Sequence, residues 1–348
     1  MSWITTQFEK AMKAFIIEKL GDTHGSVLIV EYESLRNILI KDNFYQEIKG
    51  IEPNLSDHSA THIMDVQNRA FKLLGGFEQH DLTAMDVYVL ALMILFHDVG
   101  NIFGRNGHSS VTKIAEVYNY YKSIPQNYGE ERRVVTTGAS AHSGESRAGC
   151  RDTLKYVKKD SIKDDEINLP ELAAILRFAD ELAEGKHRTC SFLIEKLTYN
   201  LDSLIYHEYA KITEIRIDRP GERIVITNTI NVSSDFETNE LEQDKVRELI
   251  IFSFYRAIKL DQERRYTKYY SSALKPFKHV TLLYRFEKNY LPLELDIEPI
   301  IFEDKYPVPG VDFVKDTIHA KELMLENFSS FNIEKVFSSL IDKKIKVI

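Results

Sequence analysis

The stretch Leu95-Phe-His-Asp-Val-Gly-Asn101 decides the fold, because it ends a long apolar run with the adjacent pair His97-Asp98. Other histidine and aspartate residues flank this pair, among them His62 upstream and Asp180 downstream. Imidazole and carboxylate groups together suit Mg, Mn, Fe, Co, Ni or Zn better than they suit a thiolate-bound metal. The sequence therefore predicts a divalent cation site built from this pair and the flanking histidines and aspartates, which also include His108 and His142.

The helix that carries the central pair has a well-marked start and end. Thr83 and Asp86 approximate a capping box, in which each side chain satisfies a backbone N–H of the other residue. The residues that follow are apolar nearly all round, which is typical of a helix buried on every side. Gly100 and Gly104 punctuate the end of this helix, where catalytic loops are often placed. We therefore expect a central helix that ends at the metal site.

The two outlying ligands also lie in helical patterns. The segment around His62 carries apolar residues at helical spacing, namely Ile63, Val66 and Ala70. The helix of Asp180 begins at Pro170-Glu171, and its inward positions are Leu172, Ile175, Leu176 and Ala179. Separate helices that converge in a bundle core are a known way to build a metal site.

The first segment of the chain does not resemble a secretion signal. Five apolar residues repeat here with helical spacing, namely Ile4, Phe8, Met12, Phe15 and Ile16. Charged residues interrupt them, and Gly21 offers a helix stop. The longest apolar run, residues 87–96, is about half of the ~20 residues that a membrane span needs.

The two cysteines, Cys150 and Cys190, form no Cys-x-x-Cys pair. We therefore expect reduced thiols, a cytoplasmic protein and no membrane partner.

The pattern changes after the helical part, which we assign to residues 1–200. Residues 214–217 and 223–226 alternate as strands, and Pro220-Gly221 between them fits the centre of a type II turn. A long helix is expected over 241–271, with Val246, Leu249, Ile250, Phe254 and Ile258 on its apolar stripe. A further strand over 280–286 completes a small α/β appendage, assigned to residues 201–290.

The remaining residues, 291–348, are expected to form a C-terminal extension. An extended stretch over 292–310 contains prolines, and two amphipathic helices follow over 312–328 and 333–340. The predicted fold class is therefore mainly α, a helical bundle with a smaller α/β C-terminal appendage. A role for the extension in docking or in assembly of a homo-oligomer is the interpretation that we favour.

In their order and contexts, His62, the His97-Asp98 doublet and Asp180 resemble the HD superfamily of metal-dependent phosphohydrolases, and the resemblance implies that these four residues are the metal ligands. The resemblance implies one or two divalent ions that polarise a phosphoryl oxygen and make water acidic enough to attack phosphorus at neutral pH. In the binuclear branch of this superfamily, later histidines hold a second metal. In the deoxynucleotide triphosphohydrolase branch, a histidine after the doublet acts as general acid or base. His108 and His142 are the candidates for either role, and with Asp98 they form the predicted catalytic set.

A second, looser resemblance is to bacterial HD proteins from conflict and defence systems. The segments Leu176-Arg-Phe-Ala-Asp-Glu-Leu-Ala183 and Asp57-His-Ser-Ala-Thr-His-Ile63 look like the closing and opening motifs of those proteins. No Gly-Tyr-Pro triplet occurs in the chain, which argues against the cyclic-di-GMP phosphodiesterase branch. This resemblance implies a nucleotide hydrolase that acts in antiviral defence.

Basic side chains next to the ligands are candidates for phosphate contacts, because arginine binds phosphate oxygens bidentately and lysine acts as a point charge. The predicted substrate-binding residues are Arg105, Arg147, Arg151, Lys186, His187, Arg188 and His58. A later basic cluster comprises Arg256, Lys259, Arg264, Arg265 and Lys268. We interpret this cluster as a charged outer face, and the alternative is a regulatory nucleotide site.

The leading functional hypothesis is a dNTP triphosphohydrolase that releases a deoxynucleoside and triphosphate. The first alternative is a phosphodiesterase acting on a cyclic or signalling nucleotide or on single-stranded nucleic acid. The second is a nucleotide-sensing scaffold that signals to a partner. The net charge of −8 disfavours a protein that coats nucleic acid, although local basic patches are compatible with it.

Overall fold

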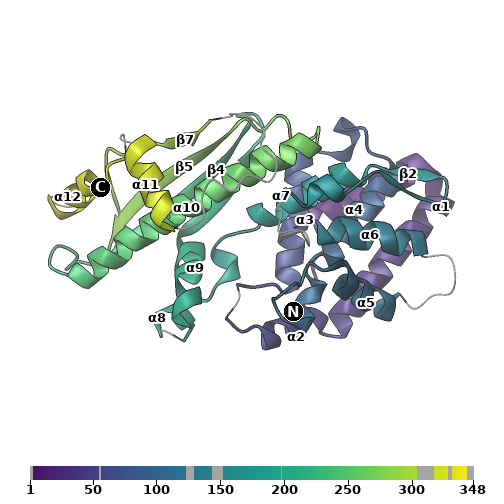
Figure 1. Cartoon of the computed structure of the whole chain (residues 1–348), viewed down its shortest axis with the longest axis horizontal. Helices are drawn as coiled ribbons and strands as arrows, with labels where there is room; N and C mark the ends of the chain where they lie inside the picture. The colour runs from purple at the N-terminus through teal and green to yellow at the C-terminus, as the bar shows by residue number, and fades with distance from the viewer. Residues whose placement is uncertain are drawn as a thin grey trace. The chain divides into compact units, whose positions relative to one another are not determined.

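The computed structural model describes residues 3–54, 56–122, 129–142, 152–196, 198–303, 317–327 and 331–342. The chain forms two compact units, the first chiefly from residues 1–183 and 264–276 and the second from residues 184–263, 277–306 and 312–348. Helices dominate the first unit, and the larger sheet belongs to the second (Figure 1). The predicted fold class, mainly α with a smaller α/β appendage, is confirmed.

Helix α4 (Ala84–Phe96) is the centre of the first unit. Thr83 and Asp86 form the predicted capping box, with Thr83 Oγ1 accepting from the Asp86 N–H and Asp86 Oδ2 accepting from the Thr83 N–H, each at 3.0 Å. Eleven consecutive residues, Asp86–Phe96, are buried, and α4 contacts α1, α3, α6 and α7. The window Ala84–Phe103 is apolar enough to cross a membrane, but 89% of it is buried inside the protein. The expectation of a buried core helix is therefore confirmed.

Helices around α4 complete the first unit. Their bounds are α1 (Gln7–Lys41), α2 (Phe44–Ile51), α3 (Ala60–Leu74), α5 (Val111–Tyr121), α6 (Gly129–Ser140) and α7 (Leu169–Leu182), with single 3-10 turns η1 (Phe77–Gln79), η2 (Val99–Phe103) and η3 (Leu154–Tyr156). A two-stranded hairpin, β1 (Asp160–Ile162) with β2 (Asp165–Ile167), lies between α6 and α7 and was not predicted. Helical geometry breaks at the predicted stop, Gly21, where φ is 74°. The helix nevertheless resumes beyond Gly21, because residues such as Tyr32 and Leu39 continue to bury their side chains.

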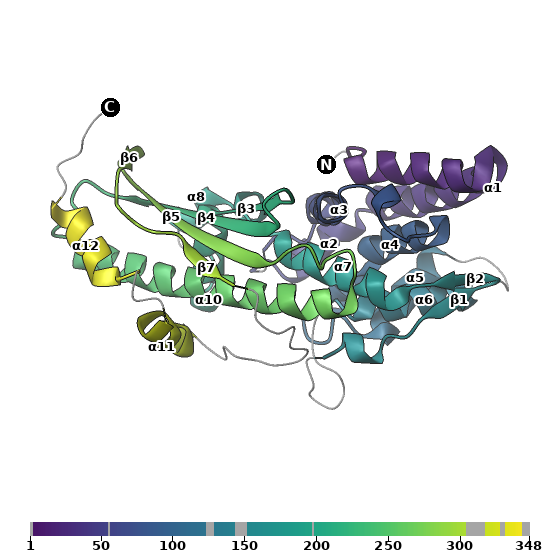
Figure 2. The same ribbon diagram turned by 90° about the horizontal axis from the view of Figure 1, so that it is seen from above.

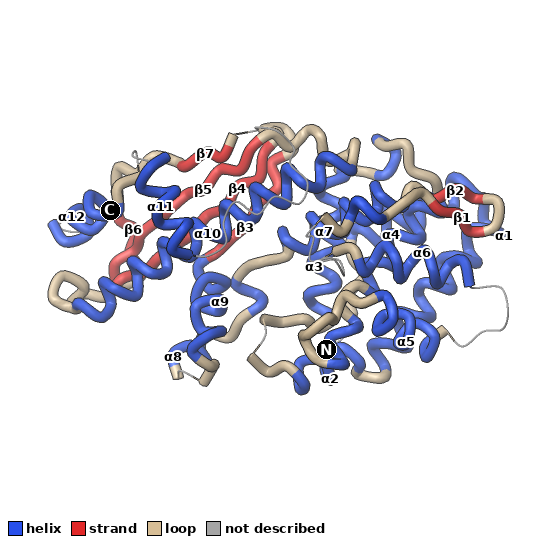
Figure 3. Tube along the Cα trace, in the orientation of Figure 1, coloured by secondary structure: helices blue, strands red, loops and turns tan. Residues whose placement is uncertain are grey.

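The second unit contains a mixed five-stranded sheet in the order β3-β4-β5-β6, with β7 also paired to β5 (Figure 3). The strands are β3 (Thr213–Asp218), β4 (Arg223–Val232), β5 (His279–Lys288), β6 (Leu291–Leu293) and β7 (Ile300–Phe302). Strands β4 and β5 pair in parallel, and α10 (Glu240–Tyr270) connects them. Figure 2 shows α10 running along the sheet. All five residues of its predicted apolar stripe are buried, and the Ser253 side chain lies 2.8 Å from the Tyr284 hydroxyl of β5.

One detail of the second unit differs from the sequence prediction, and another refines it. The turn between β3 and β4 is not type II, because the left-handed residue is Glu222 (φ 50°) and not Gly221. The stretch after β5, predicted as extended, contains the paired strands β6 and β7, whose partners lie on β5. The other elements are η4 (Lys186–Arg188), α8 (Ser191–Glu195), α9 (Leu201–Ile212), α11 (Thr317–Asn327) and α12 (Ile333–Asp342), the last two close to the predicted tail helices.

The end of α10 is anchored by two carboxylates of the first unit. Glu171 of α7 accepts hydrogen bonds from the Ser271 hydroxyl at 2.6 Å and from the Ala273 N–H at 3.0 Å. Asp152 accepts from the hydroxyls of Tyr266 and Tyr270, both at 2.8 Å. The buried carboxylate of Glu171 accepts from groups at and just beyond the last helical turn, so it anchors the segment in which α10 ends.

Candidate metal centre

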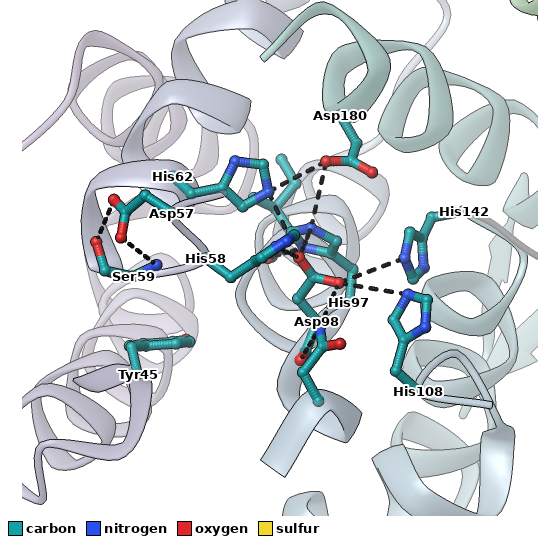
Figure 4. A network of polar contacts seen from close by, with 12 residues as sticks. Tyr45, Asp57, His58, Ser59, His62, His97, Asp98, His108, His142 and Asp180 are labelled. Carbon is teal, nitrogen blue, oxygen red and sulfur yellow. Dashed lines mark hydrogen bonds and ion pairs between the residues drawn. The ribbon is translucent and has the colours of Figure 1, made fainter. Parts of the chain in front are cut away.

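Five histidines and two aspartates meet in the first unit (Figure 4). They come from separate segments: His58 just before α3, His62 on α3, His97 and Asp98 at the end of α4, His108 in the loop before α5, His142 after α6 and Asp180 on α7. Three overlapping groups among these residues place one ligand atom per residue within 4.8 Å of the others. The structure thus brings together all four predicted metal ligands and both predicted catalytic histidines.

A first ligand group surrounds Oδ2 of Asp98. His62 Nε2 lies 3.1 Å from Asp180 Oδ1 and 3.5 Å from Asp98 Oδ2. His97 Nε2 lies 3.3 Å from Asp98 Oδ2 and 3.7 Å from Asp180 Oδ1. Both imidazoles are fully buried. We call His62, His97, Asp180 and Oδ2 of Asp98 the first ligand group.

A second ligand group surrounds the other oxygen of the same carboxylate. Asp98 Oδ1 lies 3.7 Å from His108 Nε2 and 3.6 Å from His142 Nε2. Both histidines are buried, with 7% and 3% of their surfaces exposed. Asp98 therefore presents one oxygen to each group, which is the arrangement that a carboxylate shared between two cations requires. We call His108, His142 and Oδ1 of Asp98 the second ligand group.

Three of the imidazoles are oriented by the same backbone contact. Nδ1 of His97 lies 2.8 Å from the Ile94 carbonyl oxygen, Nδ1 of His108 lies 3.1 Å from that of Arg105, and Nδ1 of His142 lies 2.6 Å from that of Ala139. A carbonyl oxygen can only accept, so Nδ1 carries the proton in each ring. Nε2 is then the nitrogen with the lone pair in the neutral ring. Metal-binding histidines are commonly held in this way by a partner on the other nitrogen.

These lone pairs face carboxylate oxygens, so the residues fit a cation. Two electron-rich atoms repel one another unless a proton or a metal ion lies between them. Among the residues that the structure describes, neither Nε2 of His62 nor Nε2 of His97 has a hydrogen-bond partner, although both are buried. Buried polar atoms are rarely left without a partner, and such an atom at a functional site commonly marks a missing ion. The donor set, imidazole nitrogen and carboxylate oxygen, accepts several divalent metals.

Without a metal, the neighbouring charges and the burial of the site shift the pKa values of its histidines and aspartates. Burial acts to lower the pKa of His97, but the Asp98 and Asp180 carboxylates raise it to about 10. Burial acts to raise the pKa of Asp98, yet the neighbouring His97 and His58 hold it well below its usual range. Burial and the neighbouring His142 and Arg105 lower the pKa of His108 to about 3. At neutral pH a proton on His97 therefore takes the place of a cation in the first ligand group.

Two residues shape the end of α4: Asn101, which sequence reasoning missed, and Gly100, which it identified only as a mark of the helix end. Asn101 donates from Nδ2 to both the carbonyl oxygen and Oδ1 of Asp98, each at 3.0 Å, and so orients the shared carboxylate. The loop of His108 passes so close to Gly100 that a Cβ there would lie 1.8 Å from the His108 carbonyl oxygen. Asn101 follows Asp98 by one helical turn, and this spacing is the signal that could have identified it.

Only some of the predicted substrate-binding residues lie at the ligand cluster. His58 belongs to the cluster itself, since its Nδ1 lies 2.8 Å from Asp98 Oδ2. Arg105 lies beside His108, with 3.3 Å between Nη1 and Nε2. Lys186, His187 and Arg188 form η4 and belong to the second unit. Arg147 and Arg151 lie outside the described residues.

The later basic cluster does not form a single outer face. Arg264 is 1% exposed, and Arg256 is paired with Glu184 at 3.2 Å. The interpretation as a uniformly solvated face is therefore wrong, because α10 is covered on more than one side. Arg264 also belongs to the first unit, whereas Arg256 belongs to the second.

Comparison with known proteins agrees with this geometry. The model of the HD-CE family matches residues 52–260, which is more than half of the chain and includes His58, His62, His97, Asp98, His108, His142 and Asp180. No curated protein and no solved structure gives a significant match. A match of this extent over the whole ligand cluster shows that the chain belongs to the HD-CE family.

Proposed function

We propose that this chain is a metal-dependent phosphohydrolase that acts on a small nucleotide, with cations in both ligand groups. The observation that carries this proposal is the position of Asp98 between two sets of imidazole nitrogens, with Oδ2 facing His97 and Oδ1 facing His142. A purely structural ion pair would need only one such set. Bound divalent cations supply Lewis-acid chemistry, which polarises a phosphoryl oxygen and makes water a stronger acid.

The protein residues provide position and charge for this reaction. Because the carbonyl oxygens of residues 94, 105 and 139 fix the ring protons on Nδ1, the three imidazoles need no reorientation to present Nε2. Asn101 holds the Asp98 carboxylate, and Arg105 offers a guanidinium beside the second ligand group. Groups that are fixed before the reaction stabilise developing charge without a cost of reorganisation.

Among substrates, a dNTP cleaved to deoxynucleoside and triphosphate is the first that we propose. A chain of phosphates needs a positive partner beside the cations, and Arg105 is the guanidinium that lies next to His108. We propose that the enzyme would act in antiviral defence by this reaction, because it would deplete the dNTPs that viral replication needs.

A phosphodiesterase on a cyclic or signalling nucleotide is the second candidate. It is favoured by the orientation of His108 and His142, which both direct Nε2 to Asp98 Oδ1. In this orientation they serve as cation ligands, and the proton-donor role expected of one of them in a triphosphohydrolase is not needed. A phosphodiester is attacked in the same way, and a nucleoside oxygen leaves in both reactions. In the dNTP reaction the attacked phosphorus stays in the released triphosphate, whereas here it stays in a phosphomonoester.

The test is turnover by the full chain with Mg²⁺, Mn²⁺, Co²⁺ or Ni²⁺, using dNTPs, NTPs and cyclic dinucleotides, with the products separated by chromatography. Nucleoside with intact triphosphate supports the first substrate class, and a linear dinucleotide or mononucleotide supports the second. His97→Ala and Asp98→Ala should each abolish turnover, whereas His24→Ala, at an exposed position of α1, should not. Absence of turnover with every metal and substrate, combined with nucleotide binding, would contradict the enzyme and favour the nucleotide-sensing scaffold.

A further inference from the structure

The side chain of Arg105 is bonded to one of the ligands of the second group. Its Nη1 lies 3.3 Å from Nε2 of His108 and 3.4 Å from Oδ1 of Asn101. Because Nδ1 of His108 donates to the Arg105 carbonyl oxygen at 3.1 Å, Nε2 is the accepting nitrogen of the neutral ring. The guanidinium therefore donates a hydrogen bond to the lone pair of His108 Nε2.

A cation in the second ligand group needs that same lone pair. A neutral imidazole has one unprotonated nitrogen, and in His108 this nitrogen is the one that lies 3.7 Å from Asp98 Oδ1. The lone pair can accept from Arg105 or bind a cation, but it cannot do both. The guanidinium and a divalent ion would in addition repel each other at this short distance.

We infer that Arg105 is an exchangeable partner of His108: a cation that enters the second ligand group releases the guanidinium, which then binds a phosphate group of the substrate. This inference rests on the proposed two-cation function. It assigns Arg105 two successive partners, first an imidazole nitrogen and then phosphate oxygens, which a guanidinium binds through two parallel N–H groups.

The exchange requires only the side chain of Arg105 to move. The backbone N–H of Arg105 donates to Oε1 of Glu52 at 2.8 Å, which ties the loop to the segment after α2. The carbonyl oxygen of Arg105 holds the His108 ring at the same time. With both backbone groups engaged, rotation about the side-chain bonds is enough to carry the guanidinium from Nε2 to a phosphate.

The consequence is a coupling between cation and substrate. The second cation makes Arg105 available to phosphate, and phosphate that holds Arg105 makes Nε2 of His108 available to the cation. Such a coupling is reciprocal, so each ligand strengthens the binding of the other by the same factor. Without the second cation, Arg105 stays with His108 and contributes little to phosphate binding.

The first experiment titrates Mn²⁺ into the full chain and measures free Mn²⁺ by electron paramagnetic resonance. His108→Ala identifies the second cation site by removing it. In Arg105→Ala, this site should bind Mn²⁺ roughly fivefold more tightly, the value of one net hydrogen bond, while the first site changes less than about twofold. Arg132→Ala is the control, because it removes the same charge from an arginine that donates to exposed Asn119.

The second experiment uses inorganic triphosphate as the probe. With saturating Mn²⁺, Arg105→Ala should bind triphosphate roughly tenfold more weakly than the wild type, the expected loss of a charge-assisted hydrogen bond. Without metal, the loss of affinity in Arg105→Ala should be no more than about twofold, because breaking the contact with His108 offsets about fivefold of the gain from the phosphate contact. Loss of affinity of the same size with and without metal would show that Arg105 is available from the start and would overturn the exchange.

The Mn²⁺ titration separates this inference from the proposed function. If the wild type binds two Mn²⁺ ions and Arg105→Ala leaves the second site unchanged, the exchange is wrong and the two-cation site stands. If both sites tighten equally in Arg105→Ala, the guanidinium acts only through its charge, and the exchange is again wrong. If the wild type binds a single Mn²⁺ ion, the two-cation function and the exchange fail together.

Discussion

A Cβ atom on Gly100 would lie 1.8 Å from the carbonyl oxygen of His108, a distance that no pair of non-bonded atoms tolerates. The backbone of the His108 loop therefore rests directly on the first residues after α4. Gly100→Ala should force this loop outward and displace His108 from Asp98, while α4 and the first ligand group keep their places. Because a shift of ~1 Å in a catalytic group can cost roughly 100-fold in rate, we expect a loss of that order in kcat.

Gly50→Ala is the matched control, since a Cβ at Gly50 of α2 meets no atom within 4 Å. Mn²⁺ titration should show one ion in Gly100→Ala and two in Gly50→Ala, with both variants folded by circular dichroism. Two ions and normal turnover in Gly100→Ala would show that the loop does not need this close approach.

Binding of the first cation should release a proton and strengthen as pH rises. The pKa of His97 is raised to about 10 without metal, so this imidazole is protonated at neutral pH and must lose its proton to bind a cation. The apparent affinity should then rise up to ~10-fold for each pH unit below that value. Calorimetry in buffers of different ionisation enthalpy measures the proton released. An affinity that does not change between pH 6 and 9 would contradict a protonated His97.

The same raised pKa makes the metal-free protein less stable in alkali. The stabilisation from protonated His97 should be fully present below the pKa of an unfolded histidine, ~6.5, and should be lost as pH rises through about 10. Urea unfolding in the presence of EDTA at several pH values measures this loss. A saturating divalent cation should suppress it, because the cation then takes the place of the proton.

Asn101→Ala should weaken cation binding without abolishing the fold. The amide orients Asp98 through two contacts of 3.0 Å, and partners of this kind contribute roughly 10- to 100-fold to metal affinity. Asn119→Ala, at an exposed position of α5, is the control. Mn²⁺ affinities of the two variants decide the question, and equal affinities would show that the carboxylate is oriented by the imidazoles alone.

Glu171→Ala should destabilise the chain by about 2 kcal/mol, since buried N–H and hydroxyl groups at the end of α10 would lose a charged acceptor. Glu166→Ala removes only an exposed ion pair with Lys159 and should leave the stability nearly unchanged. Chemical denaturation compares the two. Equal stabilities would mean that water replaces the Glu171 carboxylate at no cost.

Patterns of residues close in sequence were enough to predict the central helix of the site and its four metal ligands. The capping box at Thr83 and Asp86 and the apolar run after it predicted α4, because helix starts and buried helices depend on residues close in sequence. The order of His62, His97, Asp98 and Asp180 predicted a common site, and the structure places these four side chains in contact. The strand pairing of residues 213–218 with 223–228 also followed from alternation and a short turn.

Other features depend on geometry that spacing does not contain. The two oxygens of Asp98 face different ligand groups because backbone carbonyl oxygens orient the imidazole rings around them. Arg105 pairs with His108 because the loop that carries both residues brings their side chains together. The turn at Gly221 was predicted wrongly because Glu222 adopts the left-handed conformation in its place. The pairing of β7 with β5 joins residues 280–282 to 300–302, a long-range contact without a local signature.

The anchoring of α10 by Glu171 has a consequence for the metal centre. Glu171, which holds the end of α10, and Asp180, which belongs to the first ligand group, lie on the one helix α7, nine residues and about 14 Å apart. A shift of the end of α10 would therefore either break its hydrogen bonds to Glu171 or move α7, and with it Asp180. The position of the end of α10 and the position of the Asp180 carboxylate are therefore expected to depend on the same helix, α7.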